Sequence, residues 1–399
     1  MSKRSGKTPE RPAKAALGNL EAALSLCTYC PSLCQNACPV ATVQARHTVT
    51  PWALMSLADH VRRGRVELTE RLSETLYQCS GCGACTDACL HDNDVAETLV
   101  AVRAVAVAQG RAAFTRSLFS HADLPSGGLT TNTIDAEGKR VPADPLGSIR
   151  GDERYEESPA LSLLPGRVAL DMAAIDGGAA ETLLALCATL DQEALSAGRA
   201  ARMDLGYELW FSGHHDAFQA QARVVAEALV DTRGLVVMSP QELYLLREVY
   251  PRFGVSVDAT LIHTSEFLLP LLSGAVIERL PGSYAYHDSC YLTRNLNLDD
   301  TPREVLARVL ESPLIELPYR RSTTQCCGGT GCLPTTAPAT SEAMAGSVVD
   351  LAIAAGAEHL ISFSPECVAV MQRAAGDRLR VEHAVTVVAR AVVGDGAAG

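Results

Sequence analysis

Eight of the fourteen cysteines fall in two short runs near the start of the 399-residue chain. The second run has the spacing C-x2-C-x2-C-x3-C and consists of Cys79, Cys82, Cys85 and Cys89. Three thiolates on one tight loop can bind three irons of the same cube, while a fourth thiolate further along points to a neighbouring cluster. Gly81 and Gly83 let such a loop curl without a clash at Cβ. The run therefore predicts ligands of a 4Fe–4S cluster.

The first run has nearly the same spacing, with one extra residue between its second and third cysteines. It consists of Cys27, Cys30, Cys34 and Cys38. Pro39 follows its last cysteine, as is usual for this motif, whereas Leu90 stands at that place in the second run. A structural zinc site is the alternative, but zinc usually takes two well-separated pairs of ligands. Two compact four-cysteine runs favour iron–sulfur clusters.

Helical patterns separate and flank the two runs, and they must position the cysteines. Thr50 and Pro51 predict the N-cap and first residue of a helix that Gly64 can end. A second helix is predicted by three leucines at four-residue spacing, which are Leu68, Leu72 and Leu76. Asp94 is expected to cap a third helix that runs to Gly110.

A second group of cysteines lies in the last third of the chain. It consists of Cys290, Cys326, Cys327 and Cys367. Two glycines follow Cys327, and at this point the chain resembles the CCG-domain family. That family includes the catalytic subunit of heterodisulfide reductase and the iron–sulfur subunits of glycolate oxidase and anaerobic glycerol-3-phosphate dehydrogenase. The order of motifs is also similar, and the resemblance covers most of residues 20–390.

The resemblance implies three sets of ligands. The paired runs resemble an α-helical ferredoxin in which the fourth cysteines are exchanged between clusters. One 4Fe–4S cluster would be bound by Cys27, Cys30, Cys34 and Cys89. The other would be bound by Cys79, Cys82, Cys85 and Cys38. A third iron–sulfur site would be formed by Cys290, Cys326, Cys327 and Cys367. The full family signature ends in C-x-x-C, and here Ser364 replaces the first cysteine of that pair, as in the respiratory dehydrogenase subunits.

From residue 166 onward, short apolar runs alternate with helical patterns, which predicts parallel sheets. The candidate strands are 167–170, 208–211, 235–238, 284–287 and 359–363. With the resemblance, this predicts an α-helical ferredoxin-like N-terminal domain followed by two α/β CCG-type units with parallel sheets, the first unit degenerate. The expected divisions are a mobile tail (1–18), the helical domain (19–112), a connecting segment (113–165), the degenerate unit (166–275) and the CCG unit (276–394).

The two α/β units are expected to be copies of one another. GRVALDMAA at 166–174 aligns with GSYAYHDSC at 282–290, and MSPQEL at 238–243 aligns with FSPECV at 363–368. The first copy then has four residues without a thiol at the ligand positions, namely Ala174, Phe211, Ser212 and Glu242. We expect it to be scaffold.

Other candidate residues have simpler explanations. Cys187 lies on an apolar helical face and is expected in the core, and Cys332 is a spare ligand candidate. A cluster is favoured over a redox-active disulfide between Cys326 and Cys327. His287 either hydrogen-bonds a cluster sulfur and tunes its potential or is structural. The His214-His215 pair is expected at the surface or in packing.

Composition narrows the function further. The net charge of −12 argues against nucleic acid and anionic membranes as partners. Clustered cysteines indicate metal ligands in a reducing, cytoplasmic setting. The basic N-terminus lacks a following apolar segment, and the chain lacks an apolar run of about 18 residues. Contact with a membrane or quinone is therefore expected only through a partner. The absence of G-x-G-x-x-G and P-loop motifs predicts no flavin or nucleotide of its own.

These observations lead to one main hypothesis and two alternatives. The main hypothesis is an electron-transfer subunit of a cytoplasmic redox complex. It would carry electrons from a flavoprotein dehydrogenase, acting on a hydroxy acid or polyol phosphate, to a quinone or another carrier. The first alternative is a thiol–disulfide reductase of the heterodisulfide type that uses the CCG-site cluster. The second is an iron–sulfur sensor or assembly module, which the lack of a DNA-binding signal makes less favoured.

Overall fold

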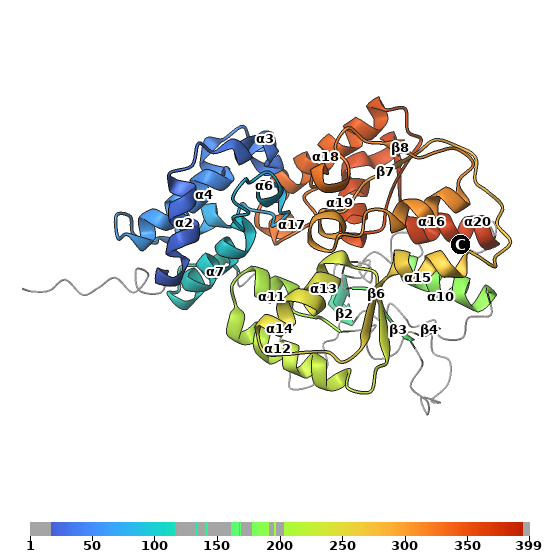
Figure 1. Cartoon of the computed structure of the whole chain (residues 1–399), viewed down its shortest axis with the longest axis horizontal. Coiled ribbons are helices and arrows are strands. Elements are labelled where there is room, and N and C mark those ends of the chain that lie inside the picture. Colours follow the sequence, from blue (N-terminus) through green and yellow to red (C-terminus); the bar gives the residue numbers. More distant parts are fainter. Residues whose placement is uncertain are drawn as a thin grey trace, which may run out of the picture.

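The computed structural model describes residues 17–115, 118, 132–134, 140–142, 161–166, 168, 178–190, 195–196 and 203–393. Figure 1 shows a helical region on the N-terminal side and two α/β regions beside it. Each α/β region is built on a four-stranded parallel sheet. Nearly all of the expected tail at 1–18 and most of the expected connection at 113–165 lie outside the described residues.

The N-terminal region is entirely helical over residues 17–115. Its elements are η1 (Gly18–Leu20), α2 (Glu21–Thr28), η2 (Leu33–Ala37), α3 (Pro39–Gln44), η3 (His47–Val49), α4 (Pro51–Arg62), α5 (Glu70–Leu76), α6 (Ala84–Asp87), α7 (Val95–Ala108) and η4 (Ala113–Thr115). Thr50 caps α4 and Asp94 caps α7, each accepting a hydrogen bond from a backbone N–H in the first turn (3.2 and 3.1 Å). Gly64 and Gly110 follow the two helix ends with φ of +69° and +66°. The three expected helices are confirmed.

The first α/β region has the strand order β4-β3-β5-β6. Its strands are β3 (Leu161–Leu164), β4 (Leu195–Ser196), β5 (Gly234–Val237) and β6 (Thr260–His263). Its helices are α10 (Ala179–Thr189), α11 (Tyr207–Phe211), α12 (His215–Ala228), α13 (Pro240–Tyr244), the π-helix η7 (Leu245–Val249), α14 (Tyr250–Arg252) and α15 (Thr264–Leu271). A separate antiparallel pair is formed by β1 (Asn132–Ile134) and β2 (Arg140–Pro142).

The second α/β region has the strand order β10-β9-β7-β8. Its strands are β7 (Tyr284–Tyr286), β8 (Ile315–Glu316), β9 (His359–Ser362) and β10 (Arg380–His383). Its helices are the π-helix η8 (Tyr291–Asn295), α16 (Thr301–Val309), η9 (Arg321–Thr323), α17 (Leu333–Thr336), α18 (Pro338–Ala354), α19 (Pro365–Ala375), η10 (Gly376–Arg378) and α20 (Ala384–Val393). Helices α10 and α15 of the first region contact α20 and α16 of the second, so the two regions share a core.

The two sheets have the same topology, because in each the first strand lies between the second and the third. In each, the third strand leads into a Ser-Pro pair that begins a helix, capped by Ser239 in α13 and by Ser364 in α19. Leu163 pairs with Val236 in the first sheet as Tyr286 pairs with Ile361 in the second. The two sheets therefore repeat one strand order.

The register corrects the alignment near the first strand. Cys290 lies four residues beyond Tyr286, and four residues beyond Leu163 is residue 167, not Ala174. Both of these positions are outside the described residues. The first strand is β3, which lies inside the range expected to be a connection, and of the strand expected at 167–170 only residue 168 is described, as helical.

The strands expected at 235–238, 284–287 and 359–363 are confirmed as β5, β7 and β9. The strand expected at 208–211 is wrong, because this segment forms α11. Gly206, with φ of +81°, precedes the helix, and its aromatic residues Trp210 and Phe211 are buried. Burial of a bulky aromatic run against neighbouring domains decided the conformation here, over the strand propensity of the residues.

Candidate metal centres

The cysteines expected around the first cluster come together in the helical domain. Cys27 lies in the last turn of α2, Cys34 lies in η2, and Cys30 is between them. Burial, together with the nearby Cys34, Cys89 and Cys30, raises the pKa of the Cys27 thiol to about 11. The side-chain amide of Asn93 donates hydrogen bonds to the Cys27 sulfur and to the Ala23 carbonyl, both 3.0 Å long. Cys89, the last cysteine of the second run, could therefore be the fourth ligand of the first cluster.

The cysteines expected around the second cluster line one common cavity. They are Cys38, Cys79, Cys82 and Cys85, and apolar side chains from α3, α4 and α7 close the cavity. Burial raises the pKa of Cys38 to about 12, and Cys79 and Cys34 contribute to this shift. The backbone N–H of Gly81 donates to the Cys79 sulfur (3.3 Å). A cavity surrounded by four thiols, with a backbone donor already directed at one sulfur, fits a 4Fe–4S cluster.

The C-terminal cysteines gather at the carboxyl edge of the second sheet. Strands β7 and β9 are parallel neighbours, so the segments that follow them, with Cys290 and Cys367, meet at one edge. Cys326 and Cys327 reach this edge on the loop before α17. Their two following glycines are required there, because a Cβ on Gly328 would lie 2.7 Å from the Ser341 carbonyl oxygen and one on Gly329 would lie 2.4 Å from that of Glu366.

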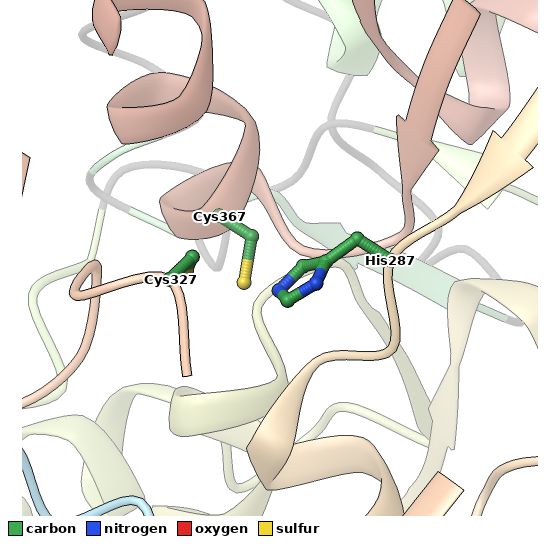
Figure 2. Close-up of side chains that lie close together, drawn as sticks. All are labelled: His287, Cys327 and Cys367. Carbon is green, nitrogen blue, oxygen red and sulfur yellow. The ribbon is translucent and has the colours of Figure 1, made fainter. Parts of the chain in front are cut away.

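His287 lies in this site beside two of the cysteines. One ligand atom each from His287, Cys327 and Cys367 lies within 4.8 Å of the other two, and all three residues are buried. Figure 2 shows the Cys367 sulfur and the His287 ring pointing toward one another. Hydrogen bonding with Cys327, and next the hydrogen bond and charge of His287, lower the pKa of Cys367 to about 5 against the effect of burial. The site therefore favours thiolate at Cys367, the form that binds metals.

The turn that carries His287 and Cys290 is anchored by an ion pair that the sequence reasoning missed. Asp288 is buried and accepts two hydrogen bonds from the Arg303 guanidinium, at 2.8 and 2.7 Å. Arg303 also binds the Glu316 carboxylate on β8 at 2.7 and 2.8 Å. Such bidentate bonds fix orientation. The signal available in the sequence was a single aspartate within the HDSC motif, which does not reveal its distant partner.

Ser364 uses its hydroxyl to cap α19, and this hydroxyl also lies beside the Cys367 sulfur. Its Oγ accepts a hydrogen bond from the Cys367 N–H (3.3 Å) and donates one to Glu366 (2.7 Å). Glu366 also receives a hydrogen bond from Ser239, the corresponding cap in the first α/β region. Burial raises the pKa of the Glu366 carboxyl to about 7. Both cap serines are thus engaged by one carboxyl group.

The second cysteine run and the C-terminal site are in direct contact. Hydrogen bonding to Cys326, together with burial, raises the pKa values of both Cys82 and Cys290 well above the ordinary range. Two residues of the second α/β region also bind the loop of the second run. Arg294 donates to the Cys82 carbonyl (2.6 Å), and Thr330 donates to the Ser80 carbonyl (2.9 Å). The structure therefore places two expected redox sites against one another although their cysteines are more than 200 residues apart in sequence.

An aromatic ring fills the space between the two loops. Phe211 lies against Gly81 of the second cysteine run and Gly331 of the CCG loop, where an added Cβ would approach the ring to 2.4 and 2.6 Å. Tyr207 stacks on Phe211 and its hydroxyl hydrogen-bonds that of Tyr291 (2.6 Å). The repeat alignment assigns Phe211 to a vacant ligand position of the first copy. The ring instead packs between the two sites.

Arg103 is fully buried at the same junction. Its guanidinium donates to the carbonyl oxygens of Leu76 (3.0 and 3.3 Å), Cys79 (3.1 Å) and Phe211 (3.1 Å). Its cationic group also lies 4.9 Å and 4.4 Å from the ring centroids of Tyr77 and Phe211. Among the residues that the structure describes, no carboxylate pairs with it. The sequence signal was a single charge within the apolar run of α7.

The remaining candidates lie outside these sites. Cys187 is buried in α10 within the core shared by the two α/β regions, as expected. Cys332 is buried beside the aromatic residues at the junction and does not join the His287 group. His214 contacts Thr115 (2.9 Å), and His215 packs against Phe253. Glu242 lies beside Gly166, so the segments after β3 and β5 meet as their counterparts do in the second region.

An open cavity of about 250 Å³ borders the junction. It is lined by Gly81, Gly83, Thr86, Asp87, Asp92, Asp94, Ala96, Glu97, Val100, Trp210, Phe211, Tyr244, Tyr291, Arg294 and Asn295. Carboxylates outnumber cations on its wall, and four aromatic rings form one side. Drug-sized ligands occupy roughly 300–1,000 Å³, so this cavity is suited to a single small ring system rather than a large cofactor.

Comparison with known proteins agrees with the two cysteine-rich segments. Residues 23–93 match the family described as 4Fe-4S dicluster domain, and residues 284–372 match the family described as Cysteine-rich domain, CCG. No helix in the described part of the chain is long and apolar enough to cross a bilayer.

Several curated proteins are similar over part of the chain. Probable iron-sulfur-binding oxidoreductase FadF of Bacillus subtilis is 27% identical over 172 residues, which cover 41% of this chain and 24% of FadF. One subunit of the dihydromethanophenazine:CoB–CoM heterodisulfide reductase of Methanosarcina mazei is 30% identical over 122 residues, covering 30% of each chain. Lactate utilization protein A 1 of Bacillus cereus is 27% identical over 179 residues, covering 42% of this chain and 73% of that protein.

A solved structure resembles the fold over 96% of this chain and 76% of its own. It is the crystal structure of a hypothetical protein from Helicobacter pylori, with a TM-score of 0.55 and 10% identity. At that identity it supports the arrangement of domains only. The two family matches show that this chain joins a 4Fe-4S dicluster domain to a CCG cysteine-rich domain, which supports iron–sulfur binding, and its relatives include an iron–sulfur oxidoreductase and a heterodisulfide reductase subunit.

Proposed function

We propose that the protein is the electron-relay subunit of a cytoplasmic redox complex, with two 4Fe–4S clusters in the helical domain and a third iron–sulfur site at the CCG cysteines. The observation that carries this proposal is the contact of Cys82 with Cys326. A ligand of the second cluster and a ligand of the third site would then be neighbours, so an electron could pass between them without a mobile carrier. The first cluster would extend the chain of redox sites through Cys34, which lies near Cys38 and Cys85.

The electrons would come from a flavoprotein dehydrogenase that oxidises a hydroxy acid or a polyol phosphate. This partner would hold the flavin, since hydride chemistry belongs to the cofactor and the chain supplies only positioning and single-electron sites. A quinone or another small carrier would accept them. A quinone would be reached through a partner. The cavity beside Tyr291 and Phe211 would suit another small carrier, because its aromatic wall suits a neutral ring and its carboxylates disfavour an anionic one.

A heterodisulfide-type reductase is the alternative that the relatives suggest. The structure offers one observation against it: the position that holds a further cysteine in disulfide-cleaving members is Ser364, whose hydroxyl is engaged in capping α19. A serine hydroxyl stays protonated near neutral pH and is a poorer ligand for iron than a thiolate.

The test uses the full chain, loaded anaerobically with iron and sulfide. We expect about twelve irons per chain, four for each of three clusters. Purification with native partners should recover a flavoprotein that reduces all three sites. Reduced dye and a thiol heterodisulfide should give no turnover, with Ser364→Cys assayed alongside. Brisk heterodisulfide reduction by the unmodified protein would reject the relay in favour of the enzyme, and about eight irons, unchanged in Cys327→Ala, would reject the third site.

A further inference from the structure

The donor set at the CCG site is not made of thiols alone. One ring nitrogen of His287 and the sulfurs of Cys327 and Cys367 all lie within 4.8 Å of one another. Cys326 is outside this close group and lies against Cys290, Cys327 and Cys82. The site is therefore asymmetric, with a nitrogen and two sulfurs on one side and thiols alone on the other.

The ring of His287 has the Cys367 sulfur as its neighbour and hydrogen-bonding group. The residue is 2% exposed, and apart from that sulfur its Nε2 atom has no hydrogen-bond partner among the described residues. A buried polar atom without a full hydrogen bond is unfavourable. Coordination of a metal would satisfy this atom, and imidazole nitrogen is a common ligand for iron and zinc.

Other buried histidines show that an unsatisfied Nε2 is not sufficient by itself. His263 and His383 also have this atom buried without a partner, but neither belongs to the group of ligand atoms around Cys327 and Cys367. His287 differs in its surroundings, because one of its ring nitrogens lies within 4.8 Å of both of these sulfurs. Of these three histidines, His287 alone is directed at thiolates that a metal would share.

We propose that His287 binds a metal of the CCG site directly, together with Cys327 and Cys367, and supplies the ligand that the chain lacks at Ser364. The two positions are close because His287 follows β7 and Ser364 follows the neighbouring strand β9, where the Ser362 hydroxyl donates to the His287 carbonyl (3.0 Å). The turn that holds the imidazole is fixed by Asp288 and Arg303. The ring is therefore pre-organised, as a ligand should be.

Binding of a cluster by both cysteine and histidine would change its reduction potential, and the consequence for electron transfer rests on the proposed function. Replacing thiolate by neutral imidazole removes negative charge from a cluster and raises its reduction potential, as in centres where histidines replace two cysteines. The third site would then be easier to reduce than the two all-cysteine clusters. Electrons that enter the helical domain would collect at the CCG site.

The experiment is pulsed electron paramagnetic resonance of the full chain, reduced and labelled with 15N-histidine. We expect a coupling from directly bound nitrogen, lost in His287→Gln and kept in His383→Gln, a matched control with an equally buried imidazole away from the cysteines. His287→Cys should keep the metal and lower the potential of this site, whereas His287→Gln should weaken metal retention about tenfold or more.

The outcomes separate this inference from the proposed function. A metal-loaded CCG site with no nitrogen coupling, and with the same potential in His287→Cys, would overturn the histidine ligand and leave the relay in place. One zinc per chain at this site, with nitrogen and sulfur neighbours in X-ray absorption, would support the ligand and overturn the third iron–sulfur cluster. A CCG site that holds no metal in the loaded protein would overturn both.

Discussion

Replacing Arg103 with methionine tests how the helical domain is joined to the rest of the molecule. The change keeps much of the length of the side chain but removes the donors that bind the carbonyls of Leu76, Cys79 and Phe211. Each buried acceptor left without a partner is unfavourable by about 1–3 kcal/mol, which gives roughly 3–9 kcal/mol for three. Removing a buried guanidinium also relieves a desolvation penalty of several kcal/mol. We expect a net destabilisation of about 2–4 kcal/mol.

The assay is equilibrium urea unfolding of the metal-free and metal-loaded protein, followed by tryptophan fluorescence. Trp210 lies in α11 next to Phe211 and should report on the junction. Arg111→Met is the control, because Arg111 forms an exposed ion pair with Glu67 (3.5 Å), and this substitution should change stability by no more than about 1 kcal/mol. Arg103→Lys keeps the charge but loses the planar guanidinium group, so its stability should lie between those of the unmodified protein and Arg103→Met.

Arg103 also carries a positive charge beside the backbone of the second cysteine run. Burial raises the pKa of the Cys79 thiol, and the Arg103 charge opposes this shift. A reduced cluster has one more negative charge than an oxidised one, so Arg103→Met should lower the potential of the second cluster. Potentiometric titration would measure this. If Arg103→Met unfolds at the same urea concentration as the unmodified protein, the guanidinium bonds do not fasten the junction and the reasoning fails.

Three further predictions follow from the geometry. Cys38→Ala should destroy the cluster built on the second cysteine run rather than the first, as judged by Mössbauer and paramagnetic resonance spectra, and loss of the other cluster would show that the fourth ligands are not exchanged. Asp288→Ala leaves the Arg303 charge without its buried partner and should destabilise the protein by about 3–5 kcal/mol in thermal or urea unfolding, whereas an effect below about 1 kcal/mol would mean that Glu316 alone holds Arg303. Burial lowers the pKa of His263 to about 3, so below about pH 6.5 the unfolded chain binds a proton that the folded protein does not bind. The free energy of unfolding should therefore fall as the pH drops from about 6.5 toward 3, by up to about 1.4 kcal/mol per pH unit. His263→Asn should reduce this pH dependence in urea unfolding at several pH values.

Local signals in the sequence predicted local structure. The caps at Thr50 and Asp94 and the Ser-Pro starts of α13 and α19 depend on neighbouring residues only, so the helix starts could be read directly. The strands β4 and β8 have two residues each, which is too short for any alternating pattern to appear. In α11 the aromatic residues favour a strand locally, and only their burial at the junction explains the helix.

In the candidate site, too, the sequence predicted what depends on neighbouring residues and missed the contacts between distant ones. Cysteine spacing identified the ligand candidates, because thiolates on one loop are constrained by the chain itself. The contact of Cys82 with Cys326, the packing of Phe211 on Gly331 and the Arg103 bonds join residues that are distant in sequence. No spacing rule encodes such contacts. His287 was considered from its position beside Cys290, but its approach to Cys367 depends on the pairing of β7 with β9.

The burial of the second cysteine run has a consequence for how the protein is made. Cys82 is nearly inaccessible once the CCG loop, Arg294 and Phe211 cover its loop. An iron–sulfur cluster delivered by another protein would therefore have to reach this thiol before the α/β regions close over the helical domain. Metal binding and folding are coupled in such sites. Maturation would thus follow a fixed order in which the helical domain is loaded first, and a chain that closes early would be trapped without its cluster.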